Sequence, residues 1–186
     1  MKNQIKINQT IKSFKKTIYV SSDKSLSIRC VLLSSIAVGK SKIFNLLQSE
    51  DVMNAISAVK KIGVKVKKKK NHFEIYGVGI NGFKIKKNTI INAGNSGTLA
   101  RCFLGLCSSI NKEIKVVGDR SLSKRDFSRV IKPLKNMGVN FYPQNKKTLP
   151  IYIKGSKYLR PIKSGNFGLL AQQKPPSSLR FCKSAA

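Results

Sequence analysis

Three short segments of this 186-residue chain place lysine or arginine among small polar residues, in settings suited to binding anions. The first is Ser22-Asp23-Lys24-Ser25-Leu26-Ser27-Ile28-Arg29, where a strand-like stretch gives way to a helix-like one. A helix N-terminus offers unpaired N–H groups and a partial positive charge. Lys24 and Ser25 add an ammonium and a hydroxyl there. Arg29 lies one turn beyond Ser25 on the same face, where its guanidinium can bind a carboxylate or phosphate through two hydrogen bonds.

A plainer interpretation of the first segment is that Ser25 caps the helix and both cations are solvated. The second segment, residues 92–101 (Asn-Ala-Gly-Asn-Ser-Gly-Thr-Leu-Ala-Arg), repeats the arrangement of strand, small-residue loop and helix start. Gly94 and Gly97 let the backbone approach a ligand closely, and Arg101 falls in the first predicted turn. Two such loops at equivalent points indicate a shared pocket for an anionic ligand.

The third segment, residues 118–126 (Gly-Asp-Arg-Ser-Leu-Ser-Lys-Arg-Asp), precedes another predicted helix and supplies further cations, Arg125 among them.

Two phosphate-loop lookalikes, in contrast, do not indicate a phosphate-binding site. Residues 77–82 fit G-x-G-x-x-G, but strand-like sequence follows where a dinucleotide fold needs a helix. Gly39-Lys40-Ser41 ends like a Walker A motif, yet it lacks the leading glycine and leaves a helix instead of entering one.

The apolar pattern predicts the elements that must position these segments, in two passes of matching order. The first pass has a strand at 17–20, a helix at 25–37 stopped by Gly39, a strand at 42–44, a helix at 50–62 stopped by Gly63, and a hairpin of 64–66 with 72–76. The second pass has a strand at 89–92, a helix at 98–108, a strand at 115–117, a helix at 127–137 stopped by Gly138, and a hairpin of 139–142 with 151–153. The unit is therefore a βαβαββ repeat of about 75 residues, and a third begins near Pro161.

Four strings, in order, carry a family resemblance: Asp-Lys-Ser-x-Ser-x-Arg at 23–29, Asn-Leu-Leu-x-Ser-x-Asp at 45–51, Gly-Asn-Ser-Gly-Thr-x-x-Arg at 94–101 and Gly-Asp-x-Ser-Leu-x-x-Arg at 118–125. The chain resembles the EPSP synthase (3-phosphoshikimate 1-carboxyvinyltransferase) family over roughly residues 16–163. The fold that this resemblance implies is α/β, an inside-out α/β barrel of tandem βαβαββ repeats, here two repeats plus a truncated third. It divides the chain into an N-terminal segment 1–16, an incomplete domain 17–163 with repeats at about 17–85 and 86–160, and an irregular tail 164–186.

The resemblance implies carboxyvinyl transfer from phosphoenolpyruvate to the 5-hydroxyl of shikimate 3-phosphate in the shikimate pathway, which supplies chorismate for aromatic amino acids. No metal or cofactor is expected. By motif match, Lys24, Ser25 and Arg29 would contact shikimate 3-phosphate, with Lys24 also reaching phosphoenolpyruvate. The phosphoenolpyruvate side would be formed by Asn95, Gly97, Thr98, Arg101 and Arg125. The family's proton-transfer residues fall outside this chain, so no catalytic residue is assigned and the isolated fragment is expected to be inactive.

The matched region departs from the family pattern at several places. Ser21-Ser22 replaces the usual Pro-Gly, and Asp126 replaces a proline and puts an acid beside Arg125. In the tail, Gln172 could match a substrate-binding glutamine, although Leu170 stands where the family has serine. The surrounding tail does not align, as a frameshift or truncation would produce.

The composition leaves two alternatives open. A net charge of +30, from 37 Lys plus Arg against 7 Asp plus Glu, is typical of nucleic-acid binders. However, Lys greatly outnumbers Arg, which AT-rich coding also explains, and aromatic residues are not interleaved with the basic ones along the chain, so no specific nucleic acid is expected. The other alternative is the sister enzyme that uses UDP-N-acetylglucosamine, against which the string at 23–29 argues.

The remaining residue types restrict the setting. Cys30, Cys102, Cys107 and Cys182 form no C-x-x-C pair, so no metal site is predicted. The three that lie inside apolar helical patterns, Cys30, Cys102 and Cys107, are expected to pack as small hydrophobes. The chain has no apolar run long enough to span a membrane and no signal-like start, so a cytoplasmic location is expected. The full-length protein is expected to be a monomer.

Overall fold

The computed structural model describes residues 21–162, which form two sheets joined through their helices. The first half contains α1 (Lys24–Ile36), β1 (Val38–Phe44), α2 (Glu50–Lys61), β2 (Lys65–Lys68) and β3 (His72–Val78). Its three strands lie in the order β1-β3-β2, and both pairs are antiparallel. The predicted helices and the hairpin are confirmed. The strand predicted at 17–20 lies outside the described residues.

The second half begins with β4 (Thr89–Asn92), α3 (Gly97–Leu106), the short 3-10 turn η1 (Cys107–Ser109) and β5 (Glu113–Val117). It continues with a second short turn η2 (Leu122–Lys124), α4 (Ser128–Asn136), β6 (Asn140–Tyr142) and β7 (Ile151–Lys154). The sheet order is β4-β5-β7-β6, with β4 and β5 parallel and the other pairs antiparallel. The order β5-β7-β6 in this half is the same as the order β1-β3-β2 in the first half.

Helix ends follow the sequence signals at most positions. The side chains of Asp23 and Ser96 accept hydrogen bonds from the backbone N–H groups of the first turns of α1 and α3. Gly63 and Gly138 follow α2 and α4 with φ of +94° and +99°, the left-handed conformation in which a helix commonly ends. The predicted stop at Gly39 is wrong. Helix α1 ends at Ile36 because Ala37 is already extended, and Gly39 lies inside β1, which starts four residues earlier than expected.

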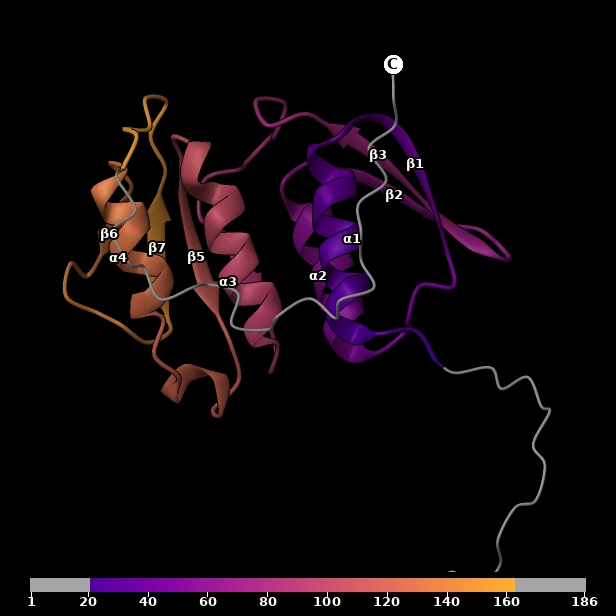
Figure 1. The fold of residues 1–186 in the computed structure, drawn as a ribbon, viewed down its shortest axis with the longest axis horizontal. Helices are drawn as coiled ribbons and strands as arrows, with labels where there is room; N and C mark the ends of the chain where they lie inside the picture. The colour runs from indigo at the N-terminus through magenta and orange to yellow at the C-terminus, as the bar shows by residue number, and fades with distance from the viewer. Residues whose placement is uncertain (1–20, 163–186) are drawn as a thin grey trace, which may run out of the picture.

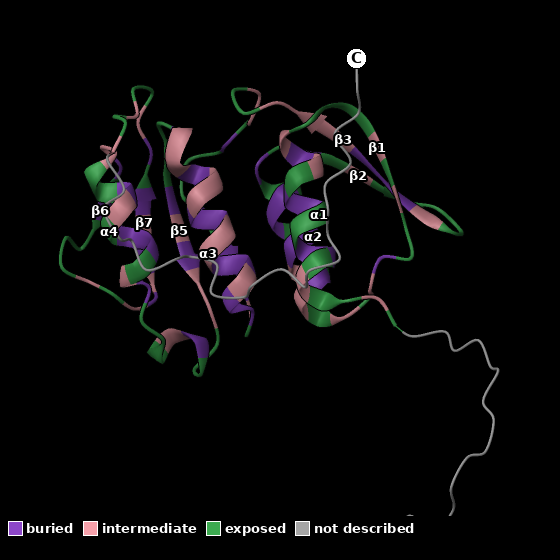
Figure 2. Ribbon diagram, in the orientation of Figure 1, coloured by how far each residue is buried: buried purple, intermediate pink, exposed green. Residues whose placement is uncertain are grey.

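Packing between helices joins the two halves. Helix α1 packs against α2, β3 and α3, while α2 also reaches β4, so that α1, α2 and α3 lie between the two sheets (Figure 1). Figure 2 shows buried residues on the facing sides of these helices and along β5 and β7. Buried apolar side chains of both halves form a single cluster, which includes the fully buried Ile28, Ile75 and Phe103.

The two phosphate-loop lookalikes have structural explanations. The strand β3 runs through Gly77 to Val78, and no helix follows before α3. A Cβ atom at Gly77 would overlap the carbonyl oxygens of Ser34 and Ala37, so glycine is required there for packing against the end of α1. Lys40 and Ser41 lie within β1, away from any helix start. Neither segment has the strand-to-helix geometry that holds a phosphate.

The cysteines divide between surface and core. Cys107 is buried, and its burial raises the pKa of its thiol, whereas Cys102 is partly exposed. Cys30 is exposed on α1, so its predicted core role is wrong, because the buried face of this helix is formed by Ile28, Val31 and Leu32. Cys182 lies outside the described residues. Within residues 21–162 no group of three or more His, Cys, Asp or Glu side chains could hold a metal ion, and no helix is long and apolar enough to cross a membrane.

Candidate anion-binding site

The first turns of α1, α2 and α3 lie at the same end of the molecule, together with the loop that contains η2 (Figure 1). Direct contacts connect them. Lys24 Nζ on α1 forms an ion pair of 2.7 Å with Asp51 Oδ2 on α2. The side chain of Asn54, one turn further along α2, packs against Gly94 in the loop before α3. The three segments singled out from the sequence thus occupy one end of the fold.

In the first segment, Asp23 rather than Ser25 caps α1, because its Oδ1 accepts a hydrogen bond of 2.6 Å from Leu26 N. The interpretation of Ser25 as the cap is therefore wrong, and Ser25 lies inside the first turn with its side chain half-buried. Lys24 remains half exposed although it is paired with Asp51. The end of α1 consequently offers an ammonium and a hydroxyl.

Arg29 lies further along α1, on the rim of a groove between α1 and α3. The groove has a volume of about 490 Å³ and is mostly apolar, with Leu33, Phe83 and Leu106 in its walls. Arg29 is exposed there and shares the groove with Cys102, the neighbour of Arg101 in sequence. Arg29 thus lies beside the groove between α1, which also carries Lys24, and α3, which carries Arg101.

In the second segment, two arginines converge on the start of α3. Gly97 is the first residue of α3 and is buried. A Cβ atom built on it would lie 2.9 Å from Arg101 Nη1 and 3.2 Å from Arg125 Nη1. The first turn of α3 contains no acidic residue. Two guanidinium groups therefore lie beside a helix N-terminus, whose partial positive charge adds to theirs.

Arg101 is held by an aromatic ring as well as by its helix. Its guanidinium carbon lies 5.4 Å from the centroid of Phe127, within the range of a cation–π contact. Phe127 is fully buried immediately before α4. The core thus fixes Arg101 on one side, while its Nη1 atom remains near Gly97. Thr98, the next residue of α3, is half-buried in the same turn.

Asn95 orients Arg125. Its Oδ1 accepts a hydrogen bond of 3.0 Å from Arg125 Nη2, and its Nδ2 donates one of 2.6 Å to Asp119 Oδ2. Arginine can only donate and a carboxylate can only accept, so the two neighbours determine which way the amide points. Asp119 also accepts a bond of 2.6 Å from Leu122 N. This backbone bond and the one from Asn95 hold the pKa of Asp119 below its ordinary value.

The acid next to Arg125 faces the other way. Asp126 accepts a hydrogen bond from Ser128 N at the start of α4. Ser128, together with the charges of Lys147 and Lys132, lowers the pKa of Asp126. Asp126 therefore serves the start of α4, and its neighbour Arg125 stays available to an anion.

Two site residues, Asp51 and Asp119, were not assigned a role from the sequence. Asp51 ends one of the four family strings and Asp119 lies near the start of another. In a chain with only 7 acidic residues, an acid inside a cationic motif is a signal that it holds a cation in place. Gln172 lies outside the described residues, so its role stays a prediction.

Exchanging Asp119 for asparagine tests its positioning role. An asparagine there can still accept from Leu122 N, but its amide nitrogen would face the amide nitrogen of Asn95. Asn95 should then turn over and present a donor to Arg125. We expect the affinity of the chain for inorganic phosphate to fall about threefold, the equivalent of one net hydrogen bond, with an unchanged thermal unfolding midpoint. Equal phosphate affinity in wild type and Asp119→Asn, measured by calorimetry, would contradict the role.

Comparison with known proteins bears on what these cations bind. The family profile of EPSP synthase (3-phosphoshikimate 1-carboxyvinyltransferase) matches residues 8–166, most of the chain. The chain belongs to the EPSP synthase family. Among its relatives are the 3-phosphoshikimate 1-carboxyvinyltransferases of Streptococcus suis (strain 98HAH33) and Streptococcus mutans serotype c, at 37% and 36% identity over 160 residues.

Solved structures of the family share the fold. The EPSP synthase of Acinetobacter baumannii superposes with a TM-score of 0.72 and 34% sequence identity, covering 82% of this chain and 35% of that one. The two streptococcal relatives are likewise matched over 86% of this chain but only 37% of their own length. The chain therefore spans a little over a third of the length of the EPSP synthases that it matches.

Proposed function

We propose that this chain forms one wall of an EPSP synthase active site, in which its cations bind the phosphate and carboxylate groups of shikimate 3-phosphate and phosphoenolpyruvate. The observation that carries the proposal is the convergence of Arg101 and Arg125 on Gly97 at the start of α3. Both substrates are polyanions, and cations fixed before the substrates arrive need little reorganisation to bind them. Family membership supports the identity of the substrates.

The residues of α1 bind mainly shikimate 3-phosphate, and those around the start of α3 bind phosphoenolpyruvate. Lys24, Ser25 and Arg29 on α1 bind shikimate 3-phosphate, and Lys24 also reaches phosphoenolpyruvate. Asn95, Gly97, Thr98, Arg101 and Arg125 bind phosphoenolpyruvate. Asp51 holds Lys24 in position, which their 2.7 Å ion pair supports. Asp119 holds Arg125 in position through Asn95, which is hydrogen-bonded to both residues.

The reaction that this site serves has two stages. The 5-hydroxyl of shikimate 3-phosphate loses its proton and adds to the central carbon of phosphoenolpyruvate, while the methylene carbon gains a proton and becomes a methyl group, which gives a tetrahedral intermediate. That intermediate then loses inorganic phosphate and one proton of this methyl group to leave the carboxyvinyl ether. This chain contributes binding, orientation and charge neutralisation. The groups that transfer the protons belong to the part of the family's length that this chain does not span.

We also propose how the chain is divided into repeated units. The chain comprises two βαβαββ units, at about 17–85 and 86–160, and the start of a third unit, within a domain at 17–163. The matching strand orders β1-β3-β2 and β5-β7-β6 support the two units. A complete protein of this kind would enclose its substrates between this wall and a second one, as a monomer.

Calorimetry with shikimate 3-phosphate tests the binding proposal. We expect weak binding to the chain and about tenfold weaker binding to Arg29→Ala, because a charge-assisted hydrogen bond is lost. Arg129→Ala removes the same charge from the exposed surface of α4 and should bind like wild type. No heat with wild type at millimolar ligand would refute binding by this chain. Phosphate release from both substrates together should be absent unless the part of the family's length that this chain does not span is supplied.

A further inference from the structure

The three-stranded sheet carries an unusual set of side chains on its outer face. Strand pairing places Lys40, Tyr76 and Lys65 in one row across β1, β3 and β2. The next row along consists of Lys42, Glu74 and Lys67, and Phe44 pairs with His72 beyond it. Because side chains alternate between the two faces of a strand, these eight residues share one face. We call it the basic–aromatic face.

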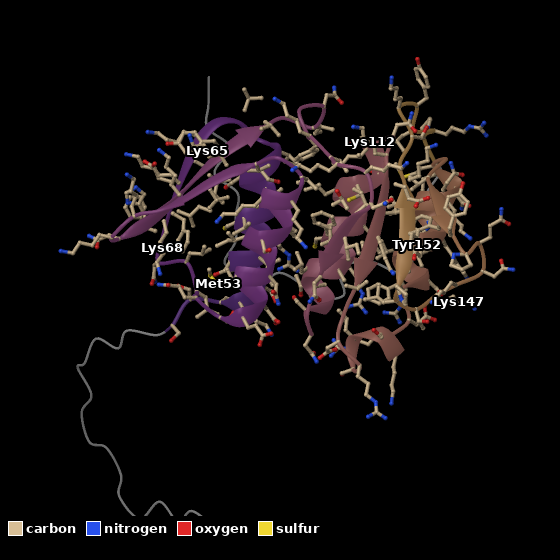
Figure 3. All side chains as sticks on the ribbon, turned by 180° about the vertical axis from the view of Figure 1, so that it is seen from behind. Met53, Lys65, Lys68, Lys112, Lys147 and Tyr152 are labelled. Carbon is tan, nitrogen blue, oxygen red and sulfur yellow. The ribbon has the colours of Figure 1, made fainter. Side chains whose placement is uncertain are left out.

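Burial shows which way this face points. The intervening residues of β3, Phe73 and Ile75, are buried in the core. On the basic–aromatic face the four lysines are exposed and Phe44 is 64% exposed. Figure 3 shows the sheet from behind, with Lys65 labelled on β2. Among the described residues, this face is therefore exposed and accessible to a partner molecule.

Glu74, the one acid of this face, is already satisfied. It accepts a hydrogen bond of 3.0 Å from Tyr76 Oη and lies 3.8 Å from Lys40 Nζ and 3.7 Å from His72 Nε2. The bond from Tyr76, with the charge of Lys40, lowers the pKa of Glu74. Four lysines surround this single carboxylate, so the face has a net positive charge.

The aromatic rings lie among these cations. Lys65 Nζ and Lys67 Nζ lie 5.7 and 5.9 Å from the centroid of the Tyr76 ring. At the other end of the face, the rings of Phe44 and His72 are 5.1 Å apart and tilted by 34°. Along the sequence, basic and aromatic residues are not interleaved, but strand pairing interleaves them in space. This face therefore has the mixture of cations and aromatic rings that the linear sequence lacks.

We propose that the basic–aromatic face binds single-stranded nucleic acid without sequence preference. Lysines spaced across neighbouring strands can neutralise consecutive phosphates, which supplies most of the affinity in such complexes. An exposed ring such as Phe44 gives a base a surface on which to stack, whatever the base. The combination of cations and an exposed ring fits a single strand better than a duplex, in which the bases are stacked inside.

The charge component can be tested with a fluorescent oligouridine. With four phosphates neutralised, we expect the affinity of wild type to fall about 50-fold between about 50 and 200 mM salt. Lys65→Gln/Lys67→Gln should reduce the slope of log affinity against log salt by about 1.4. Lys86→Gln/Lys87→Gln removes the same charge from exposed residues before β4 and should leave the slope unchanged. Equal effects of the two pairs would show attraction by net charge alone and overturn the assignment to this face.

The stacking component separates nucleic acid from other polyanions. Phe44→Ala should weaken oligouridine binding about fivefold or more, and it should leave the binding of heparin, which has no bases, unchanged. Because Phe44 is exposed, this variant should keep the wild-type unfolding midpoint. Equal oligouridine affinity in Phe44→Ala and wild type would overturn the nucleic-acid assignment. Shikimate 3-phosphate binding should be the same in all these variants, so this result is separate from the test of the proposed function.

Discussion

Replacing Arg125 by alanine is expected to weaken the binding of phosphoenolpyruvate to this chain about tenfold, because a charge-assisted hydrogen bond to the ligand is lost. Arg125 is the better target of the two arginines at Gly97. Arg101 also packs on the Phe127 ring, so its removal would disturb the core as well as the charge. Arg125 is exposed. Within the described residues, its side chain makes one hydrogen bond, from the guanidinium to Asn95. The affinity can be measured by calorimetry or by ligand-detected NMR.

The matched control for Arg125→Ala is Arg120→Ala. Arg120 is exposed in the same loop, five residues earlier. The guanidinium groups beside Gly97 belong to Arg101 and Arg125, and not to Arg120. Its removal lowers the net charge equally and should change the affinity much less. If both variants lost affinity to the same extent, phosphoenolpyruvate would be held by the overall charge of +30 and not by a site.

Replacing Phe103 by alanine is expected to lower the free energy of unfolding by about 3–5 kcal/mol, the usual cost of truncating a buried aromatic residue. Phe103 is fully buried on α3, two turns after Gly97, and α3 packs against both α1 and α4. The helix that carries Gly97, Thr98 and Arg101 is thus held by this side chain. Urea unfolding followed by circular dichroism measures the loss.

Tyr158→Ala provides the comparison for Phe103→Ala. Tyr158 is 86% exposed, so its truncation should change the free energy of unfolding by no more than about 0.5 kcal/mol. A similar small effect in Phe103→Ala would mean that α3 is not packed as the structure has it, and the arrangement of cations at its first turn would lose its support.

Much of the fold followed from local sequence signals. Helix α2 was predictable because Val52, Ile56 and Val59 repeat at helical spacing and Gly63 can adopt the left-handed conformation that ends it. The start of β1 was not predictable in the same way. Residues 38–41 are mostly exposed and lack apolar alternation, and they form a strand because β3 pairs with them. Local sequence patterns do not show which residues distant in sequence will pair.

The candidate site was predictable in its cations but not in its acids. Arg101 could be placed from its distance to a glycine-rich helix start, since such starts bind anions in many folds. The roles of Asp51 and Asp119 depend on contacts across 27 and 24 residues, with Lys24 and Asn95 respectively. The cap of α1 was misassigned for a simpler reason. Asp and Ser are similar as caps, and the chain offers Asp23 two residues before Ser25.

Titration of the ¹⁵N-labelled chain with phosphoenolpyruvate tests the central proposal most directly, because NMR reports each backbone amide separately. We expect the amides of Gly97 and Thr98 to shift and saturate with rising ligand, whereas those of β6 should not move. Arg125→Ala should weaken this response. The absence of saturable shifts at Gly97 and Thr98, or equal shifts at lysine-rich surfaces throughout the chain, would contradict an anion site at the start of α3.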